Sequence, residues 1–197
     1  MLTKRDLLPE GHVTVTGPAE ESGSSFSFVG ELQRWGRDIV FASLIAILFV
    51  VFVVQPVKVE GTSMEPKLQA QDRIFVNKLG YHFSEVERAD IVVFWFPKDQ
   101  SKSFIKRVVG LPRETVEIRS GIVYIDGEKL QETYVPPEYF DFKSYPPEIV
   151  PYDSFFVLGD HRSSSNDSRN WGFVPKNYIF GEAIFRYWPP AKVGMIY

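Results

Sequence analysis

Three polar segments interrupt the apolar stretches of this chain, and each carries side chains that can do chemistry. The first, GTSMEP at residues 61–66, contains Ser63. The second, FIKRVVGLP at residues 104–112, contains Lys106. A serine hydroxyl attacks a carbonyl carbon when a base lies within hydrogen-bond reach and N–H groups face the oxyanion that forms. The plainer interpretation of Ser63 is a turn in which its hydroxyl accepts a backbone N–H.

Lys106 lies beside Arg107 in an apolar run of strand length. Because successive strand side chains point to opposite faces, one of the two faces inward, or both lie at an edge. Burial disfavours the ammonium and lowers the pKa of a lysine from its ordinary value of ~10.4. A neutral lysine can then take the proton of a serine hydroxyl. The alternative is an edge lysine that blocks aggregation between strands.

The third segment, GDHRSSSNDSRNWG at residues 159–172, follows the apolar run SFFVL and contains two aspartates and two arginines, Asp160, Arg162, Asp167 and Arg169. A solvated loop is the ordinary interpretation of such a stretch. Two Asp–Arg pairs and buried aromatic residues beside them would instead make the loop rigid. Rigid loops at strand ends are common places for site residues.

A run of 16 residues without charge, IVFASLIAILFVVFVV at residues 39–54, precedes these segments. As a helix it would span ~24 Å, slightly less than a bilayer core of ~30 Å, and extension back through Trp35 supplies the missing length. We therefore expect a membrane-anchoring helix over residues 29–56, with a buried core helix as the alternative. A cleaved signal peptide fits less well, since the run starts late and no A-x-A-like site follows it. The polar residues 1–28 read as a disordered tail.

The remainder of the chain, residues 57–197, is patterned for β-strands. Apolar runs of strand length, rich in β-branched and aromatic residues, occupy residues 73–76, 91–96, 104–109, 154–158 and 178–188. Two further strands, 115–119 and 122–125, meet across Ser120-Gly121, and Asp126-Gly127 marks another hairpin turn. Residues 131–151 are rich in Pro and Tyr and read as an irregular excursion. The prediction is one all-β domain behind a single transmembrane helix.

The composition excludes several classes of site. The chain has 197 residues, of which 44% are hydrophobic, so it can bury a real core. It contains no cysteine, which excludes disulfides, thiol catalysis, iron–sulfur clusters and zinc–thiolate sites. The histidines, His12, His82 and His161, are far apart, and a net charge of −3 does not favour nucleic-acid binding. No nucleotide loop, metal cluster or dinucleotide motif appears, so we expect no cofactor and no metal.

Taken together and in this order, the segments resemble those of type I signal peptidases, the bacterial leader peptidases. The Ser-Met-x-Pro motif of that family is matched by residues 63–66, and its R-G-D-I-V-V-F stretch is approximated by residues 88–94. Its K-R-V-x-G-x-P stretch is matched by residues 106–112, and its G-D-N-R-x-x-S-x-D-S-R-x-W-G signature by residues 159–172 with one change. The resemblance implies an antiparallel β-sheet catalytic domain of the signal-peptidase type.

The resemblance implies a serine endopeptidase with a Ser/Lys dyad, in which Ser63 is the nucleophile and Lys106 is the general base. The backbone amide of Ser63 would donate to the oxyanion, and around Gly61 only the backbone could help. Supporting and orienting roles fall, by the same resemblance, on Ser165 beside the lysine and on the ion-pairing residues Arg107, Asp160, Asp167 and Arg169.

The family's substrate is the signal peptide of an exported preprotein, which binds as an added strand with small side chains in two shallow pockets. By the resemblance, the pocket residues are Val57, Val59, Met64, Leu68, Phe104 and Ile105.

Membrane lipid and the translocation machinery are further expected partners, and nucleic acid is not. We expect a single-pass membrane protein with a cytoplasmic N-terminus and an extracytoplasmic catalytic domain. The flanking charges do not favour this orientation, but long domains cross membranes largely regardless of charge.

The sequence departs from the family's pattern at four positions. His161 replaces the usual Asn, Ala89 and Arg113 each replace a Gly, and Lys67 stands where Thr is frequent. None of these changes removes a catalytic atom. His161 offers a rival base for Ser63, although the adjacent Asp160 is badly placed to orient its ring.

Two other functions stay open at this point. A Ser–Lys autoprotease of the SOS-repressor type shares a related β core, but residues 1–56 contain no helix-turn-helix pattern. A non-enzymatic, membrane-anchored β domain that binds partners is the second alternative. It would be favoured if Ser63 and Lys106 lay far apart in the fold.

Overall fold

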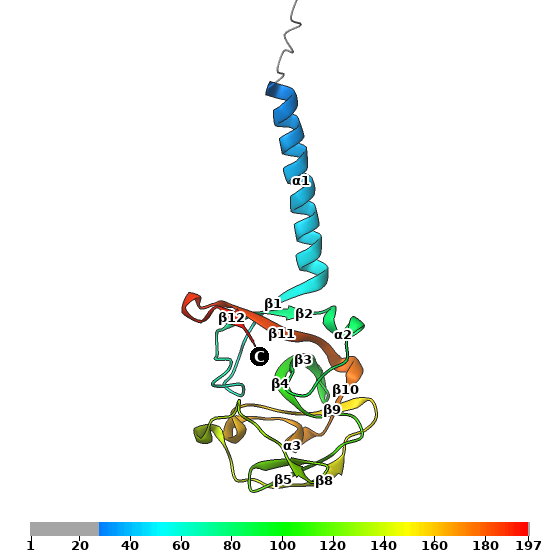
Figure 1. Cartoon of the computed structure of the whole chain (residues 1–197), viewed down its shortest axis with the longest axis vertical. Coiled ribbons are helices and arrows are strands. Elements are labelled where there is room, and N and C mark those ends of the chain that lie inside the picture. Colours follow the sequence, from blue (N-terminus) through cyan, green and yellow to red (C-terminus); the bar gives the residue numbers. More distant parts are fainter. Residues whose placement is uncertain (1–27, 197) are drawn as a thin grey trace, which may run out of the picture. The chain divides into compact units, whose positions relative to one another are not determined.

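The structure is a computed structural model that describes residues 28–196 (Figure 1). The disordered tail that we expect over residues 1–28 therefore lies, except for its last residue, outside the described part of the chain. Residue 28 itself begins the first helix.

The first helix, α1, covers Phe28–Val53 and leads directly into the strand β1, Val54–Lys58. The expected helix over residues 29–56 thus ends three residues early. Pro56 explains the difference, because proline cannot donate a helical hydrogen bond and biases the residue before it, Gln55, towards extended backbone. Within the described residues, no helix meets the length and hydropathy needed to cross a membrane.

The larger sheet is antiparallel throughout, with the strand order β1-β2-β11-β3-β4-β9-β10, and β12 pairs with β11. Its strands after β1 are β2 (Arg73–Asn77), β3 (Ile91–Phe96), β4 (Asp99–Gly110), β9 (Ser154–Leu158), β10 (Val174–Pro175), β11 (Ile179–Trp188) and β12 (Gly194–Met195). The apolar runs in the sequence are thus confirmed as strands.

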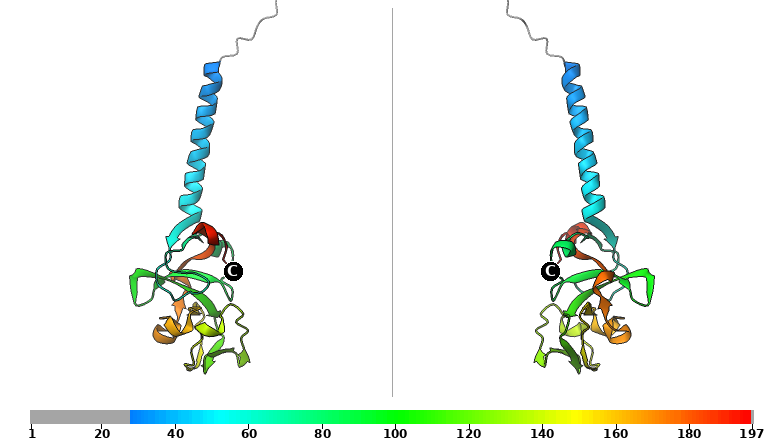
Figure 2. Two further views of the ribbon diagram at one scale, coloured as in Figure 1. Left: turned by 90° about the vertical axis from the view of Figure 1, so that its left-hand side faces the viewer. Right: turned by 90° about the vertical axis from the view of Figure 1, so that its right-hand side faces the viewer.

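A second antiparallel sheet has the order β7-β6-β5-β8. Its strands are β5 (Thr115–Arg119), β6 (Ile122–Ile125), β7 (Glu128–Lys129) and β8 (Tyr145–Ile149). Ser120-Gly121 and Asp126-Gly127 form the two hairpin turns, and all four residues have positive φ, as a type I′ turn requires. In Figures 1 and 2, β5 and β8 lie at the opposite end of the β-domain from β1 and β2.

The segment 131–151 is only partly irregular, which corrects the expectation. It contains a single 3-10 turn at Pro137–Tyr139 and the strand β8, which pairs with β5. Pro146 and Pro147 hide this strand in the sequence, because proline lacks the N–H of a ladder bond. An edge strand such as β8 tolerates them, since only one of its edges is paired.

The helical elements after α1 are short. The α-helices are α2 (Gly80–Phe83) and α3 (Ser168–Trp171), and further 3-10 turns occupy Arg162–Ser164, Lys176–Tyr178 and Pro190–Lys192. The core therefore consists mainly of strand side chains. Ile91 and Val93 of β3 pack into one apolar cluster while Val92 and Phe94 pack into another, so this central strand is buried on both faces.

Candidate active site

Ser63 and Lys106 meet although 43 residues separate them. The Lys106 ammonium nitrogen lies 2.7 Å from Ser63 Oγ and 3.0 Å from the carbonyl oxygen of Ile105. Lys106 projects from β4, and Ser63 lies in the loop of residues 59–72 between β1 and β2, the nucleophile loop. The separation that would have favoured a non-enzymatic domain is not found.

The nucleophile loop is held by the core directly after its serine. Met64, directly after Ser63, is fully buried with Leu68 in the cluster that contains Ile74 and Val76 of β2. The Leu68 amide donates to the Met64 carbonyl at 2.8 Å. Packing of these apolar neighbours therefore fixes the backbone from which the Ser63 hydroxyl projects.

Lys106 is almost fully buried, with 4% of its surface exposed. Burial lowers the pKa of its ammonium to about 8, while the negative charges of Asp167 and Asp160 act in the opposite direction. The face of the Phe104 ring lies 5.5 Å from the nitrogen. A substantial fraction of neutral amine is therefore present near pH 8, as a general base requires.

The Ser63 amide is free of protein acceptors in the described part of the chain. Within the described residues it makes no hydrogen bond to the protein, and the Thr62 carbonyl of the same peptide unit accepts from the Glu65 amide at 3.1 Å. Gly61 directly precedes this turn and has φ +80°, in the left-handed region that favours glycine. A Cβ added to Gly61 would meet no atom of the described residues within 4 Å, so backbone conformation rather than crowding calls for glycine.

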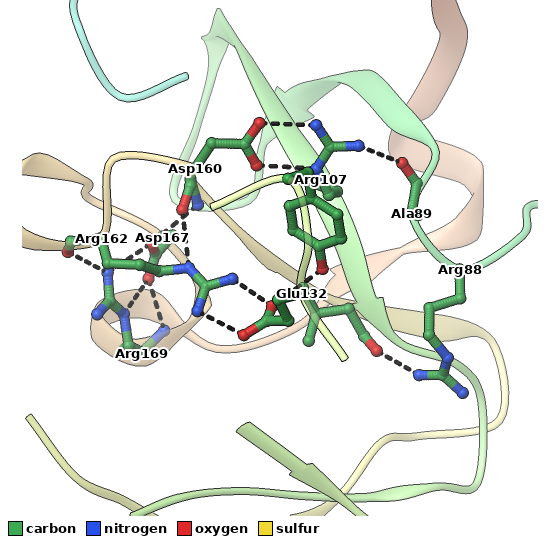
Figure 3. Close-up of polar contacts among 11 residues, drawn as sticks. Arg88, Ala89, Arg107, Glu132, Asp160, Arg162, Asp167 and Arg169 are labelled. Atoms are coloured by element: carbon green, nitrogen blue, oxygen red, sulfur yellow. Dashed lines mark hydrogen bonds and ion pairs between the residues drawn. The ribbon is translucent and has the colours of Figure 1, made fainter. Parts of the chain in front are cut away.

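A buried ion pair lies next to the dyad. Arg107 donates to both carboxylate oxygens of Asp160 at 2.8 and 2.7 Å, and the two side chains are each about 1% exposed (Figure 3). Arg107 also donates to the Ala89 carbonyl at 2.8 Å, and its guanidinium stacks 4.1 Å from the centre of the Tyr134 ring. Arg107 and Asp160, both among the ion-pairing residues expected from the resemblance, thus pair with each other.

A second ion pair stiffens the loop of residues 159–172, the polar loop. Arg169 donates to Asp167 through Nε and Nη2, each at 2.8 Å, and Asp167 also accepts from the Gly159 amide at 3.1 Å. Arg169 further donates to the Arg162 carbonyl at 2.8 Å (Figure 3). It also donates to Asp141 at 2.6 Å. The polar loop is therefore tied down rather than solvated.

Ser165, expected to orient Lys106, makes no such contact. Its hydroxyl is buried and has no hydrogen-bond partner within the described residues, while Lys106 donates elsewhere. The hydroxyl does lie against Gly159, where an added Cβ would stand 2.2 Å from Ser165 Oγ and 2.4 Å from the Ser63 carbonyl oxygen. Gly159 is thus required for the close approach of the polar loop to the nucleophile loop.

The sequence interpretation missed the acidic and aromatic residues that segment 131–151 supplies to this region. Glu132 forms a bidentate ion pair with Arg162, and the Tyr134 hydroxyl donates to Glu132 at 2.9 Å (Figure 3). Asp141 pairs with Arg169. Charge balance could have indicated these carboxylates. Once Asp160 is paired with Arg107, a buried Arg162 needs another carboxylate.

His161 does not compete with Lys106 for the Ser63 hydroxyl. Its backbone amide donates to the Ser63 carbonyl at 3.1 Å. Its ring Nδ1 lies 3.3 Å from the Thr62 carbonyl oxygen and 3.8 Å from a Glu65 carboxylate oxygen, and the ring meets Tyr139 edge-on. The rival mechanism, with His161 as the base, finds no support in this arrangement.

A groove of about 740 Å³ leads to the dyad. Among the described strands β1 pairs only with β2, and β4 pairs with β9 only from Arg107 onwards, so both strands leave a stretch of edge open. The apolar lining consists of Val57, Val59, Val93, Phe104 and Ile105, with Ser63 and Lys106 also on the wall. Four of the six expected pocket residues therefore line the groove.

The other two expected pocket residues, Met64 and Leu68, do not line the groove. Both are buried in the core below the nucleophile loop, which corrects the expectation. Val93 of β3, which was not expected, lines it instead. Among the described residues no cluster of three His, Asp or Glu side chains could hold a metal ion.

The arrangement is chemically that of an acyl-transfer site. It holds a hydroxyl against a buried amine, an unengaged amide at the nucleophile, and open strand edges that can accept a peptide backbone.

The chain is similar to known proteins. The family model "Signal peptidase, peptidase S26" matches residues 32–188. Signal peptidase I of Leptolyngbya laminosa is 39% identical over 189 residues, 91% of each chain. Probable signal peptidase I-1 of Synechocystis sp. is 41% identical over 167 residues, 80% of this chain and 83% of the relative. A crystal structure of a signal peptidase I from Enterococcus faecalis matches with 33% identity and a TM-score of 0.42, over 50% of this chain and 97% of that one.

The family match includes Ser63, Lys106 and the whole polar loop within one continuous stretch. The chain therefore belongs to the signal peptidase family, peptidase S26.

Proposed function

We propose that this protein is a membrane-bound serine endopeptidase that removes N-terminal signal peptides from exported preproteins. The observation that carries the proposal is the 2.7 Å contact between Lys106 Nζ and Ser63 Oγ at the wall of an open-edged groove. Relatives that bear the name signal peptidase I match most of the chain and support the same activity.

The chemistry follows from the roles of the two side chains. The neutral Lys106 amine takes the proton of the Ser63 hydroxyl as Oγ bonds to the scissile carbonyl carbon, and the resulting oxyanion accepts a hydrogen bond from the Ser63 amide. The Lys106 ammonium then gives its proton to the leaving amine as the C–N bond breaks. Water, deprotonated by the same amine, hydrolyses the acyl-enzyme and restores Ser63.

Substrate binding uses the open edges of the sheet. A signal peptide in extended conformation adds between the open edges of β1 and β4, where backbone hydrogen bonds give affinity and side-chain pockets give specificity. The apolar wall formed by Val57, Val59 and Ile105 leaves room for small side chains near Ser63 and rejects large ones sterically. Cleavage after a small residue is the expected outcome.

We place the protein at a membrane through residues 29–56. The uncharged run of residues 39–54 supports this, as do apolar side chains of α1, such as Phe41, Ile45 and Phe49, that stay exposed in the structure. The N-terminus is cytoplasmic and the catalytic domain is extracytoplasmic in this proposal. Membrane lipid and the translocation machinery are its expected partners. Carbonate extraction of membranes and protection from added protease test the attachment and the orientation.

Cleavage of a preprotein in a detergent–lipid mixture, with sequencing of the product N-terminus, tests the activity. Wild type should cut after a small residue, while Ser63→Ala and Lys106→Ala should be folded but inactive. Ser101→Ala and Lys98→Ala, at exposed positions on or near β4, are matched controls that should keep full activity. An inactive wild type, or cleavage by folded Ser63→Ala, would contradict the proposal.

A further inference from the structure

The orientation of one peptide unit decides whether the oxyanion can be stabilised. The Thr62 carbonyl and the Ser63 N–H belong to the same planar group, and in a trans peptide they point in opposite directions. Any contact that holds the Thr62 carbonyl on one side therefore aims the Ser63 N–H towards the other side. That N–H has no partner within the described residues, as a donor reserved for substrate requires.

The polar loop holds this carbonyl through His161. The ring Nδ1 of His161 lies 3.3 Å from the Thr62 oxygen. Since a carbonyl oxygen can only accept, the contact places a proton on Nδ1. The Glu65 amide donates to the same oxygen at 3.1 Å, so the two lone pairs of the carbonyl are both engaged.

Two further contacts fix the positions of the His161 backbone and ring beside the nucleophile loop. The His161 amide donates to the Ser63 carbonyl at 3.1 Å, which fixes the next peptide unit as well. The edge-on contact with Tyr139, 4.8 Å between ring centres, sets the plane of the imidazole. Tyr139 belongs to segment 131–151, so this segment acts on the nucleophile loop indirectly, through His161.

We propose that His161 is a positioning residue for the oxyanion donor: through Nδ1–H it holds the Thr62 carbonyl and so aims the Ser63 amide at the transition state. This inference rests on the proposed peptidase activity. Asparagine can replace it, because its side-chain N–H stands at about the same distance from the backbone as Nδ1 of histidine. A phenylalanine keeps the ring beside Tyr139 but has no N–H to donate.

Steady-state kinetics on a preprotein substrate test the role with the full chain in detergent–lipid mixture. His161→Phe should lower kcat by about tenfold or more with little change in KM, since a misaimed oxyanion donor weakens only the transition state. His161→Asn should restore most of the rate. Tyr139→Phe, which keeps the ring contact, should act like wild type, and Tyr139→Ala should show a smaller loss of the same kind.

A kcat for folded His161→Phe equal to that of wild type would overturn the inference while leaving the peptidase activity in place. So would a loss of rate in His161→Asn as large as that in His161→Phe. If His161→Phe does not fold, Tyr139→Ala carries the same test.

Nitrogen-15 NMR of the histidine rings gives a readout that does not depend on activity. The His161 signal, assigned by its absence in His161→Asn, should report a proton on Nδ1. A neutral ring protonated only at Nε2 would overturn the inference even if the enzyme is active, and a proton on Nδ1 would support it even if a chosen preprotein is not cut.

Discussion

Lys106 and Arg107 are consecutive residues of β4 whose charged ends meet different partners. The Lys106 amine lies 2.7 Å from Ser63 Oγ, whereas Arg107 forms a bidentate ion pair with Asp160. Both side chains are buried, because alternate strand positions face opposite sides and each side is covered. One charge is thus compensated by a carboxylate, and the other is left to lose its proton.

Cleavage should depend on pH through Lys106. Its pKa is lowered to about 8 by burial, and only the neutral amine can accept the serine proton. The rate should therefore rise with pH and level off above about pH 8. A profile of kcat/KM against pH on a preprotein checks this, and a plateau that already begins at pH 6 would contradict it.

The stability of the fold should also depend on pH through Lys106, since the buried ammonium that is useless as a base is also destabilising. The pKa of Lys106 is about 8 in the folded state and near 10.5 in the unfolded state, so burial of the charged amine destabilises the fold at neutral pH. The free energy of unfolding therefore rises between about pH 8 and 10.5, where the unfolded state binds more protons than the folded state. Lys106→Met should be more stable than wild type at pH 7, by up to about 3 kcal/mol, and the gap should narrow as pH rises. Denaturant unfolding at several pH values measures it, with the exposed Lys143→Met as control.

Breaking the buried ion pair should cost far more than breaking an exposed one. Asp160→Asn leaves the Arg107 guanidinium buried without its charge partner and should lower the free energy of unfolding by roughly 3–5 kcal/mol. Glu85→Gln breaks the exposed pair with Lys176 and should cost about 1 kcal/mol or less. Equal losses in the two variants would show that burial does not set the strength of these pairs.

Gly159 should be intolerant of any side chain. An alanine there would place Cβ 2.2 Å from Ser165 Oγ and 2.4 Å from the Ser63 carbonyl oxygen, so the polar loop would have to move away from the nucleophile. We expect Gly159→Ala to lower kcat at least tenfold, in line with the sensitivity of reacting groups to small displacements. Gly194→Ala, where the added Cβ meets free space, is the matched control and should keep wild-type kinetics.

Two departures from the family pattern sit at strained backbone positions. Ala89 and Arg113 have φ of +77° and +73°, where glycine is the residue without strain. Ala89→Gly should therefore raise the free energy of unfolding by about 0.5–1 kcal/mol. Arg113→Gly should gain less, because it also removes the stacking of the guanidinium on Tyr152, 4.5 Å from the ring centre. Thermal unfolding of the two variants shows which gains more stability, and a loss of stability in Ala89→Gly would contradict the prediction.

Local features of the sequence predicted the local structure well. The turn residues Ser120-Gly121 and Asp126-Gly127 specify their hairpins because few residues accept positive φ at both turn positions. The apolar run IVVFWF likewise specifies a strand buried on both faces over most of its length.

Features that depend on distant contacts could not be predicted from the residues alone. Whether Met64 and Leu68 face the groove or the core depends on how the nucleophile loop folds back onto β2, and they face the core. The pairing of Glu132 with Arg162 joins two irregular segments 30 residues apart, which no periodicity reveals. The meeting of Ser63 and Lys106 was expected only from the resemblance to a family.

The most direct test of the Ser–Lys pair uses the absence of cysteine from this chain. In Lys106→Cys the only thiol can be alkylated with 2-bromoethylamine in the unfolded state, which rebuilds an amine of lysine length with a sulfur in place of one methylene. We predict that Lys106→Cys does not cleave a preprotein, that the alkylated and refolded protein recovers cleavage, and that its pH profile shifts to lower pH, because the thioether lowers the pKa of the amine. Full alkylation without any recovery in a folded protein, or cleavage by the unmodified variant at the wild-type rate, would contradict the assignment of Lys106 as the base.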